Sequence, residues 1–435
     1  MKHPTTRRQF VTAGTALSCA ALVPGARVAL AAPPSTKLRD AVRDVANAAV
    51  DSGDIPGVVA QVWRKGELVA DAAAGCLDME SKAPMDRGAI FGLASMTKPV
   101  TVALALRLME EGKLRLDDPI TRWAPEFGEM RVLRRPDGPL DDTVPAARPI
   151  TVEDLMMHRS GFAYGFITPP PLGTALLGRF GMGIASEMTP DAWLKSLAEL
   201  PLVYQPGERF NYGQSIDVLG FVAARVLGTD LPTAMREKLL APLGMDDTGF
   251  RVPPEKRSRM ATFYISTQPG QFMPSTVDAF TTDRPMAYLG GQGLASTASD
   301  YLRFARMLLN DGKLERVRVL KPETVRLMRS NRFTDAQRKF PFVAGAPFTQ
   351  GFGLGVSVVI DENQPGIVTG RAGTFGWPGA FGGWWQADPQ EELILIWLQG
   401  CTPAPPQPGA ASLPRLPGAQ SQRQFRQAVY EAIDA

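Results

Sequence analysis

The sequence predicts an α+β fold, in which a β-sheet domain assembled from both ends of the chain carries a mainly helical insertion. Two observations predict this arrangement. Strand-like runs rich in β-branched and aromatic residues occur near residues 58–70 and again across residues 353–398. The middle of the chain, up to about residue 285, shows short helical patterns separated by proline-containing loops. With 435 residues, the chain is long enough for one large composite domain or for several ordinary ones.

The first elements follow from the spacing of apolar residues. Residues 37–51 place apolar side chains on one helical face, which predicts a helix. Residues 58–70 contain two apolar runs around a Lys65-Gly66 turn, which predicts a β-hairpin. A second helix is expected at about residues 95–111, where Gly112 ends it.

The later elements change from helical to strand periodicity. Ser299 is expected to cap a helix at about residues 300–310. The strands that follow are expected at residues 353–360, 381–387 and 393–398. Residues 402–418, rich in Pro, Gly and Ala, are expected to form a loop, and a helix at residues 422–433 follows it.

The charge balance argues against a large surface for nucleic acid. The chain has 47 basic and 44 acidic residues, but residues 1–31 hold four of the basic residues and no acidic one. The remainder therefore sets 43 basic residues against 44 acidic ones. It lacks the excess of positive charge that a nucleic-acid partner requires.

Residues 1–31 have the pattern of an export signal. Arg7 and Arg8 precede an apolar run at residues 11–22, and Ala29-Leu30-Ala31 is an A-x-A cleavage pattern. Paired arginines before a modest apolar run are typical of twin-arginine signals. We therefore expect passage through the Tat export machinery and a periplasmic or secreted protein. No stable membrane anchor is expected, because no later apolar run is long enough to span a bilayer.

Histidine and cysteine are too scarce for metal chemistry. Beyond residue 31 only His158, Cys76 and Cys401 remain, whereas a zinc site needs three or four ligands with motif spacing, so no metal site is expected. A Ser-His-Asp triad would need His158, and the chain has no G-x-S-x-G motif to present a serine. A serine hydrolase here therefore needs another base. A Cys76–Cys401 disulfide is chemically permitted after export, and the sequence leaves this pairing open.

One tetrad carries the elements of nucleophilic catalysis: Ser95-Met96-Thr97-Lys98. If a helix begins at Ser95, Lys98 lies one turn later on the same face, so its amine can approach the serine oxygen. The helix N-terminus would also offer free N–H groups to a developing oxyanion. The tetrad alone is a weak signal, since a capping serine followed by a solvated lysine has the same spacing.

Five further segments give the tetrad a context, and all occur in order along the chain. They are residues 94–99 with 110–118, 150–162 (Ile-Thr-Val-Glu-Asp-Leu-Met-Met-His-Arg-Ser-Gly-Phe), 205–212, 243–250 and 291–297. Together they resemble the serine β-lactamase and DD-peptidase superfamily, in its class C β-lactamase-like branch with the family VIII carboxylesterases. The resemblance implies an antiparallel β-sheet flanked by helices, with a mainly helical inserted domain.

We expect a discontinuous sheet domain at residues 37–90 and 286–435. The helical domain at residues 91–285 would carry Ser95, Lys98 and Tyr212.

Two motifs depart from the lactamase pattern. The family's Y-x-N reads Tyr212-Gly213-Gln214, and its K-T-G reads Trp377-Pro378-Gly379-Ala380, where family VIII esterases often carry a tryptophan. The resemblance implies that Trp377, Gly379 and Gln214 contact the substrate. A less favoured alternative is that Trp377 is a strand-end aromatic residue packed in the core. The resemblance matches His158 to no catalytic role, so we expect it to be structural.

The resemblance implies acyl transfer to water without a cofactor. Ser95 would attack an ester or amide carbonyl, and Lys98 with Tyr212 would take its proton and return one to the leaving group. Backbone N–H groups of Ser95 and Ala380 would form the oxyanion hole, since Pro378 has no N–H to offer.

Several functions fit these motifs. The leading hypothesis is a carboxylesterase on short-chain neutral esters, or a relative acting on small amides such as 6-aminohexanoate oligomers. The second is a β-lactamase or D-alanyl-D-alanine carboxypeptidase. A non-catalytic binding protein on the same fold is a third, against which the intact Ser95, Lys98 and Tyr212 argue.

Overall fold

The main sheet of the protein joins strands from both ends of the chain. Its order is β14 (Gly351–Phe352), β15 (Ser357–Val358), β16 (Phe375–Gly376), β17 (Trp384–Asp388), β18 (Leu393–Leu398), β1 (Gly57–Arg64), β2 (Glu67–Asp78) and β3 (Ala83–Pro84). Every neighbouring pair in it is antiparallel. The two ends of the chain meet at β1 and β18, where Val59 is opposite Leu398 and Arg64 is opposite Leu393. The predicted α+β class with an antiparallel sheet is therefore confirmed.

These coordinates come from a computed structural model. It describes residues 36–434 apart from 184–185, 276–277, 283, 285, 339–340, 344–345, 348 and 405–414. The expected export signal at residues 1–31 lies outside the described residues.

Strand β18 shows how the sequence divides the core into two layers. Leu393, Leu395 and Trp397 point to one face of the sheet and belong to one apolar cluster, while Ile394 and Ile396 belong to the other. All are buried, because successive side chains of a strand point to opposite faces and both faces are covered. An uninterrupted apolar run is the expected sequence of such a strand.

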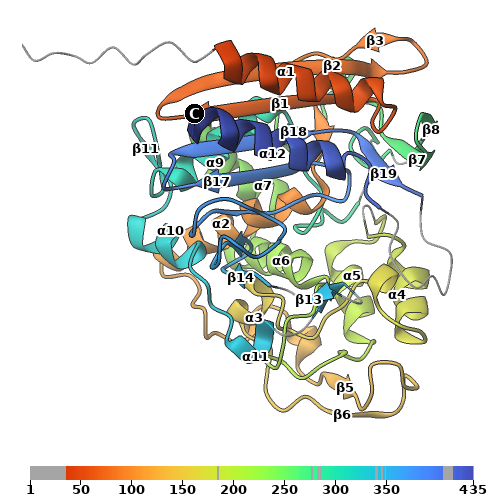
Figure 1. Ribbon diagram of the computed structural model, residues 1–435. Helices are drawn as coiled ribbons and strands as arrows, with labels where there is room; N and C mark the ends of the chain where they lie inside the picture. Colours follow the sequence, from red (N-terminus) through yellow and green to blue (C-terminus); the bar gives the residue numbers. More distant parts are fainter. Residues whose placement is uncertain are drawn as a thin grey trace, which may run out of the picture. The chain divides into compact units, whose positions relative to one another are not determined.

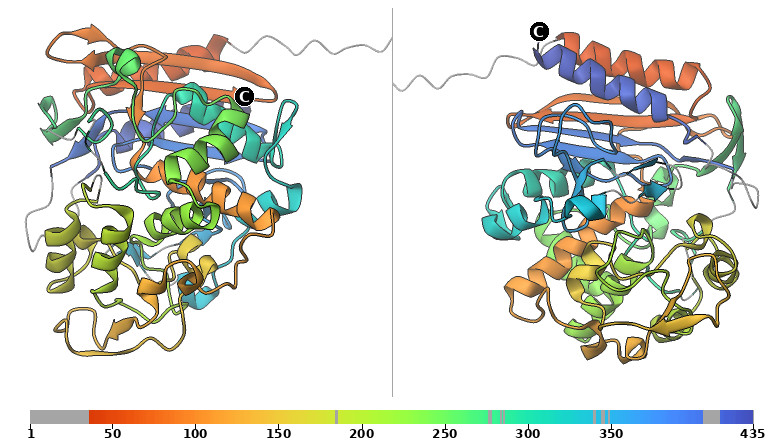
Figure 2. Two further views of the ribbon diagram at one scale, coloured as in Figure 1. Left: turned by 180° about the vertical axis from the view of Figure 1, so that it is seen from behind. Right: turned by 60° about the horizontal axis from the view of Figure 1, so that its bottom comes forward.

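Helices α1 (Thr36–Asp51) and α12 (Ala419–Asp434) cover one face of the sheet and lie side by side on it (Figures 1 and 2). Val42 of α1 and Phe425 of α12 are fully buried in the cluster that contains Trp397. The rings of Trp397 and Phe425 are 5.4 Å apart between centroids. The two ends of the described chain are thus packed into one layer.

The opposite face of the sheet is covered by α9 (Ala298–Leu309), which contacts β1, β17 and β18. Helix α2 (Thr97–Glu110) belongs to the same apolar cluster and is buried along almost its whole length. The other helices are α3 (Val152–Met156), α4 (Leu172–Phe180), α5 (Pro190–Ala198), α6 (Ser215–Leu227), α7 (Leu231–Met235), α8 (Ala241–Leu243), α10 (Pro322–Met328) and α11 (Asp335–Arg338).

Short strands complete the described fold. They pair as β4 (Phe91–Gly92) with β9 (Ala295–Ser296), β5 (Arg131–Leu133) with β6 (Thr143–Pro145), β10 (Lys313–Leu314) with β11 (Val317–Arg318), and β12 (Pro341–Val343) with β13 (Ala346–Pro347). A three-stranded sheet has the order β19 (Cys401–Pro403), β7 (Tyr264–Gln268) and β8 (Gln271–Pro274).

Several predicted boundaries are wrong for identifiable reasons. The cap of α9 is Thr297, whose hydroxyl accepts from the Asp300 N–H, and Ser299 lies inside the helix. The strand expected at residues 353–360 is instead the hairpin of β14 and β15, in which Gly355 takes a positive φ of 75°. Residues 402–403, expected in a loop, extend β19 parallel to β7.

Two further observations concern the described residues only. Cys76 and Cys401 are free thiols there, so the disulfide that the sequence left open is not formed. No single described helix is long and apolar enough to cross a membrane, although Ser215–Leu227 and Leu231–Leu243 pass the same test as a pair bent by 82°.

Candidate active site

Ser95 lies in a 3-10 turn, Ala94–Met96, that leads directly into α2. The α-helix therefore begins at Thr97, two residues later than the sequence predicted. Ala94, immediately before the serine, has a positive φ of 45°, a conformation that is strained for a residue with a Cβ. Lys98 stands in the first turn of α2 with 1% of its surface exposed, and its Nζ lies 3.0 Å from Ser95 Oγ. The spacing that suggested a serine and lysine pair does bring the two groups together.

Tyr212 supplies a second partner for the serine. Its hydroxyl donates to Ser95 Oγ over 2.7 Å, and Lys98 Nζ lies 4.8 Å from the centre of its ring. Tyr212 belongs to the segment just before α6, so a loop 117 residues away in sequence completes the group. Ser95 itself is 8% exposed, which leaves a small opening for a substrate.

Lys98 has two more partners, which sequence reasoning missed. Its Nζ donates to the Tyr164 hydroxyl over 3.2 Å and to the Gly291 carbonyl over 2.8 Å. Gly291 opens one of the motifs that the sequence contains, whereas Tyr164 comes two residues after another. These motifs could have suggested the two contacts with Lys98 only if the fold had been known.

Asp217, in the first turn of α6, joins these two partners. One carboxylate oxygen accepts from the Tyr164 hydroxyl over 2.9 Å, and the other accepts from the Gly291 N–H over 2.7 Å. Asp217 is 1% exposed, and burial raises the pKa of its carboxyl, while nearby Lys98 acts in the opposite direction. No feature of the sequence singled out Asp217.

Two buried side chains beside the serine have displaced pKa values. Burial, and then the Asp217 carboxylate, raise the pKa of Tyr164 well above its usual value, so this phenol keeps its proton at neutral pH. Burial, and then Lys98, lower the pKa of His158 well below 6.5, so the imidazole is neutral. The His158 ring centre is 4.7 Å from that of Tyr212, and neither nitrogen has a hydrogen-bond partner among the described residues.

Trp377 packs against Tyr212. Its indole N–H donates to the Tyr212 hydroxyl over 3.3 Å, and the two ring centres are 5.6 Å apart. Only 1% of Trp377 is exposed. The indole lies next to Tyr212 as a neutral hydrogen-bond donor, and substrate contact by Trp377 stays a prediction.

The loop between β16 and β17 lies against the turn that carries Ser95. A Cβ added to Gly379 would come within 2.3 Å of the Leu93 carbonyl oxygen, so only glycine permits this approach. Ala380, the next residue, is exposed. The N–H of Ala380 remains the expected partner of Ser95 in an oxyanion hole.

The contacts of Gln214 do not assign it a role in the reaction. It occupies the N-cap position of α6 with 2% of its surface exposed. Its Oε1 has no hydrogen-bond partner among the described residues. Substrate contact by Gln214, like that by Gly379, stays a prediction.

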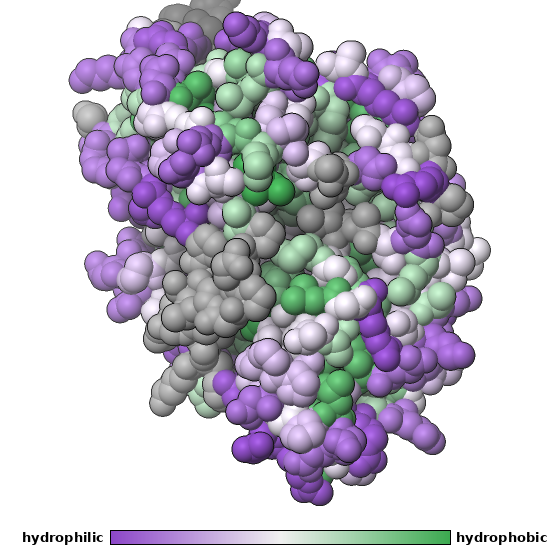
Figure 3. All heavy atoms as spheres, turned by 90° about the vertical axis from the view of Figure 1, so that its right-hand side faces the viewer, coloured by the Kyte–Doolittle hydropathy of each residue, from purple (hydrophilic) through white to green (hydrophobic). Residues whose placement is uncertain are grey.

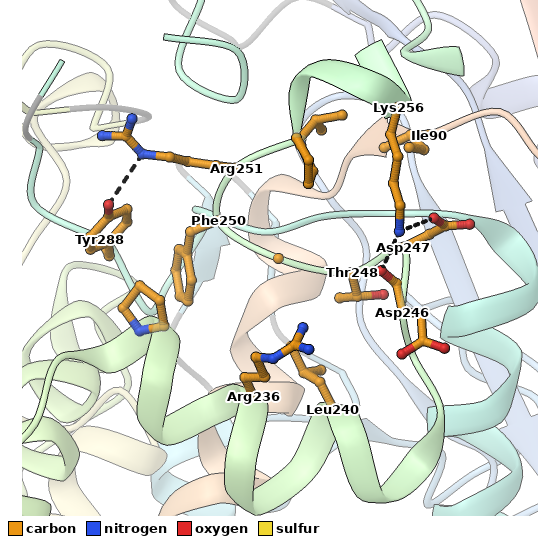
Figure 4. A pocket seen from close by; sticks show the side chains of 14 residues that line it. Ile90, Arg236, Leu240, Asp246, Asp247, Thr248, Phe250, Arg251, Lys256 and Tyr288 are labelled. Atoms are coloured by element: carbon orange, nitrogen blue, oxygen red, sulfur yellow. Dashed lines mark hydrogen bonds and ion pairs between the residues drawn. The ribbon is translucent and has the colours of Figure 1, made fainter. Parts of the chain in front are cut away.

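One pocket of the described residues is lined without Ser95. The pocket in Figure 4, of about 230 Å³, is bordered by Arg236, Arg251 and Tyr288, and the Arg251 guanidinium donates to the Tyr288 hydroxyl. The face in Figure 3 is mixed, with hydrophilic side chains at its margins and hydrophobic ones toward its middle. Among the described residues, no group of three or more His, Cys, Asp or Glu side chains is placed to hold a metal ion.

Comparisons with known proteins identify the family of this chain. A family model described as Beta-lactamase matches residues 42–413. Protein Rv1367c of Mycobacterium tuberculosis (strain ATCC 25618 / H37Rv) is 47% identical over 353 residues, which cover 80% of this chain and 86% of that protein. Esterase EstB of Burkholderia gladioli is 32% identical over 79% of this chain and 85% of its own length.

A solved structure extends the match to three dimensions. EstCE1, titled a hydrolase with promiscuous acyltransferase activity, aligns with a TM-score of 0.74 and 29% identity over 91% of this chain and 98% of its own. The resemblance on which the motif analysis rests is confirmed. The chain belongs to the beta-lactamase family and has a class C β-lactamase-like fold.

Proposed function

We propose that this protein is a carboxylesterase that cleaves short-chain neutral esters through an acyl-enzyme on Ser95. The observation that carries the proposal is the pair of groups at Ser95 Oγ, with Lys98 Nζ at 3.0 Å and the Tyr212 hydroxyl at 2.7 Å. Both distances suit proton transfer, which requires hydrogen-bond contact. The names of EstB as an esterase and of EstCE1 as a hydrolase support ester cleavage.

In the first half of the reaction, Ser95 Oγ attacks the ester carbonyl as Lys98 and Tyr212 accept its proton. The negative charge that forms on the carbonyl oxygen would be stabilised by the N–H groups of Ser95 and Ala380. The carbon–oxygen bond to the alcohol then breaks, and the same pair returns the proton to the departing alkoxide. The acyl group remains on Ser95.

In the second half, water takes the place of the alcohol. Lys98 and Tyr212 accept a proton from the attacking water, and the serine oxygen leaves with a proton as the acid is released. No step in this scheme consumes a cofactor. Lys98 is buried, and electrostatic interactions are stronger there than in water.

The choice of neutral esters rests on Trp377. The K-T-G motif of β-lactamases provides a cation for the substrate carboxylate, and a charge-assisted hydrogen bond of this kind is worth roughly 1.5 to 3 kcal/mol. Here the corresponding residue is an indole whose N–H already donates to Tyr212. A carboxylate-bearing β-lactam or D-Ala-D-Ala peptide therefore loses that attraction, whereas a neutral ester does not need it.

Intact-mass spectrometry with a slowly hydrolysed ester tests the nucleophile. We expect one acyl adduct, on a peptide that contains Ser95, and none on the Ser95→Ala variant, which should fold but show no turnover. Ser160, a buried serine that bonds Ser215, gives a matched control as Ser160→Ala. An adduct on another serine, or full turnover by Ser95→Ala, would refute the assignment, and a folded wild type without any adduct would favour the binding-protein alternative.

A further inference from the structure

Lys98 donates to three oxygen atoms, of which only one belongs to the nucleophile. The other two are the Tyr164 hydroxyl at 3.2 Å and the Gly291 carbonyl at 2.8 Å. A charged lysine has three N–H donors, whereas a neutral one has two donors and one lone pair. A lysine that accepts the serine proton must therefore keep its lone pair, and neither of its two N–H groups, toward Ser95.

Asp217 holds both of these other oxygens in place. Its carboxylate accepts from the Tyr164 hydroxyl at 2.9 Å and from the Gly291 N–H at 2.7 Å. A Cβ on Gly291 would lie only 2.6 Å from the nearer carboxylate oxygen, so the carboxylate is seated directly on the glycine backbone. Tyr164 and Asp217 are both buried, which leaves neither group room to turn away.

The direction of each hydrogen bond follows from these contacts. The Gly291 carbonyl can only accept, so it takes one N–H of Lys98. The Tyr164 hydroxyl has one proton, which it donates to Asp217. Its oxygen therefore accepts the second N–H of Lys98. When Lys98 is neutral, both of its donors are then occupied, and the lone pair faces the remaining neighbour, Ser95 Oγ.

We propose that Asp217 is a positioning residue, which aims the lone pair of Lys98 at Ser95 by fixing Tyr164 and Gly291 as acceptors. The inference rests on the proposed function, since it assigns Asp217 a part in the acylation of Ser95. Asp217 touches neither the serine nor the substrate in this scheme and acts through its two neighbours.

Asp217→Asn changes the direction of one hydrogen bond at nearly constant size. The Gly291 N–H requires the amide oxygen of the asparagine, so the amide NH2 faces Tyr164 and donates to its hydroxyl. The Tyr164 proton must then point elsewhere, and it competes with Lys98 for space and for acceptors. Tyr164→Phe removes the hydroxyl that links Asp217 to Lys98, and it serves as the second variant.

The chain offers a matched control in Asp388. This carboxylate is also buried, accepts from the Tyr430 hydroxyl over 2.7 Å and from the Arg371 N–H over 3.2 Å, and lies at the end of β17. Asp388→Asn therefore makes the same chemical change to the same kind of aspartate and tyrosine pair, outside the contacts of Ser95 and Lys98. It controls for the stability lost when a buried carboxylate is replaced.

The experiment measures kcat and KM for p-nitrophenyl butyrate at pH 7.5, with circular dichroism to verify folding. For Asp217→Asn we expect kcat to fall by about tenfold or more and KM to change by less than about twofold. Asp388→Asn should keep its kcat within about twofold. In the Tyr164→Phe background, Asp217→Asn should lower kcat by less than about threefold, because both changes break the same hydrogen-bonded link from Asp217 to Lys98.

Three results would overturn the proposal: a folded Asp217→Asn variant with wild-type kcat, losses that multiply in the double variant, or a loss of kcat/KM that comes from KM alone. If Asp217→Asn does not fold, Tyr164→Phe decides, and a wild-type kcat for that variant also overturns it. Failure of the proposed function is distinct, because the wild type and Ser95→Ala would then show equal rates on the ester.

Discussion

The strained residue beside the nucleophile is Ala94, whose φ of 45° places it in the left-handed region. Left-handed conformations cost energy for residues with a Cβ and persist only where the surroundings enforce them. Here Ala94 is buried as the first residue of the turn that holds Ser95, two residues after β4, so the packing of its neighbours offsets that cost. The strained turn places Ser95 just before the N-terminus of α2, where its hydroxyl contacts Lys98 and Tyr212.

His158 gives a prediction on pH and stability, because it is the only histidine beyond residue 31. Its pKa is lowered in the folded protein by burial, whereas the unfolded chain titrates near 6.5. Below pH 6.5 the unfolded state therefore binds a proton that the folded state does not, so the free energy of unfolding falls as the pH falls. The loss should reach about 1.4 kcal/mol per pH unit and should vanish above pH 7.5.

Urea unfolding at pH 5.5, 6.5, 7.5 and 8.5 measures this dependence. His158→Asn is the matched variant, because His158 has a positive φ of 52° and asparagine tolerates that conformation. The carboxyl groups titrate alike in both proteins, so the difference between the two curves isolates the imidazole. Parallel curves for the two proteins would contradict a neutral, buried His158.

The sequence predicted only part of this group of residues. Ser95 and Lys98 are three positions apart, and one helical turn brings them together whatever the rest of the chain does. Tyr212 was found through its motif. Asp217 in α6 and Tyr164 in a loop are 53 positions apart, and no local spacing encodes their contact.

At the scale of elements, the loop before β9 needs a glycine at residue 291. A Cβ on Gly291 would lie 2.6 Å and 2.7 Å from the two Asp217 carboxylate oxygens. Gly291→Ala should therefore displace the carbonyl that accepts from Lys98, and kcat should fall by about tenfold or more. Steady-state kinetics together with the melting temperature would check this expectation.

Gly178 of α4 is the control for that substitution. A Cβ there would meet no atom within 4 Å, so Gly178→Ala should keep its kcat and gain up to about 1 kcal/mol of helix stability. A Gly291→Ala variant with the kcat of the Gly178→Ala variant would mean that the loop adapts without disturbing Lys98.

Elements with a clear period were predicted well, and short ones were not. The helix at residues 37–51 matches α1 closely, and the hairpin around Lys65-Gly66 matches β1 and the first residues of β2, which continues to Asp78. The buried run of β18 was also found. The run at residues 353–360 failed because Gly353 and Gly355 allow a tight hairpin, and apolar composition alone does not separate one strand from two short ones.

At the scale of the molecule, strands from residues 57–84 and 351–398 complete one sheet. The sheet therefore cannot be finished until the last third of the chain is available. The sequence foresaw that strands lie at both ends, and the division into domains at residues 90 and 285 stays a prediction. The strand order, with β18 next to β1, could not be read from the sequence because many pairings of these strands satisfy the same pattern.

We also propose that the chain is exported folded, through its twin-arginine pattern. Such a route suits a protein whose sheet requires both ends before it can form. Replacing Arg7 and Arg8 with lysine should leave precursor in the cytoplasm, as measured by immunoblots of cell fractions. Equal periplasmic delivery of the double variant and the wild type would remove the basis for this proposal.

The central claim is that this family member cleaves neutral esters in preference to carboxylate-bearing substrates. The direct measurement compares kcat/KM for p-nitrophenyl butyrate, nitrocefin and a D-Ala-D-Ala peptide on the same preparation, with Ser95→Ala as the blank. The account predicts that the ester is favoured by at least about a hundredfold, or about 2.7 kcal/mol in transition-state free energy. A wild type that cleaves nitrocefin or the peptide as efficiently as the ester would contradict the esterase account and favour a cell-wall peptidase or β-lactamase.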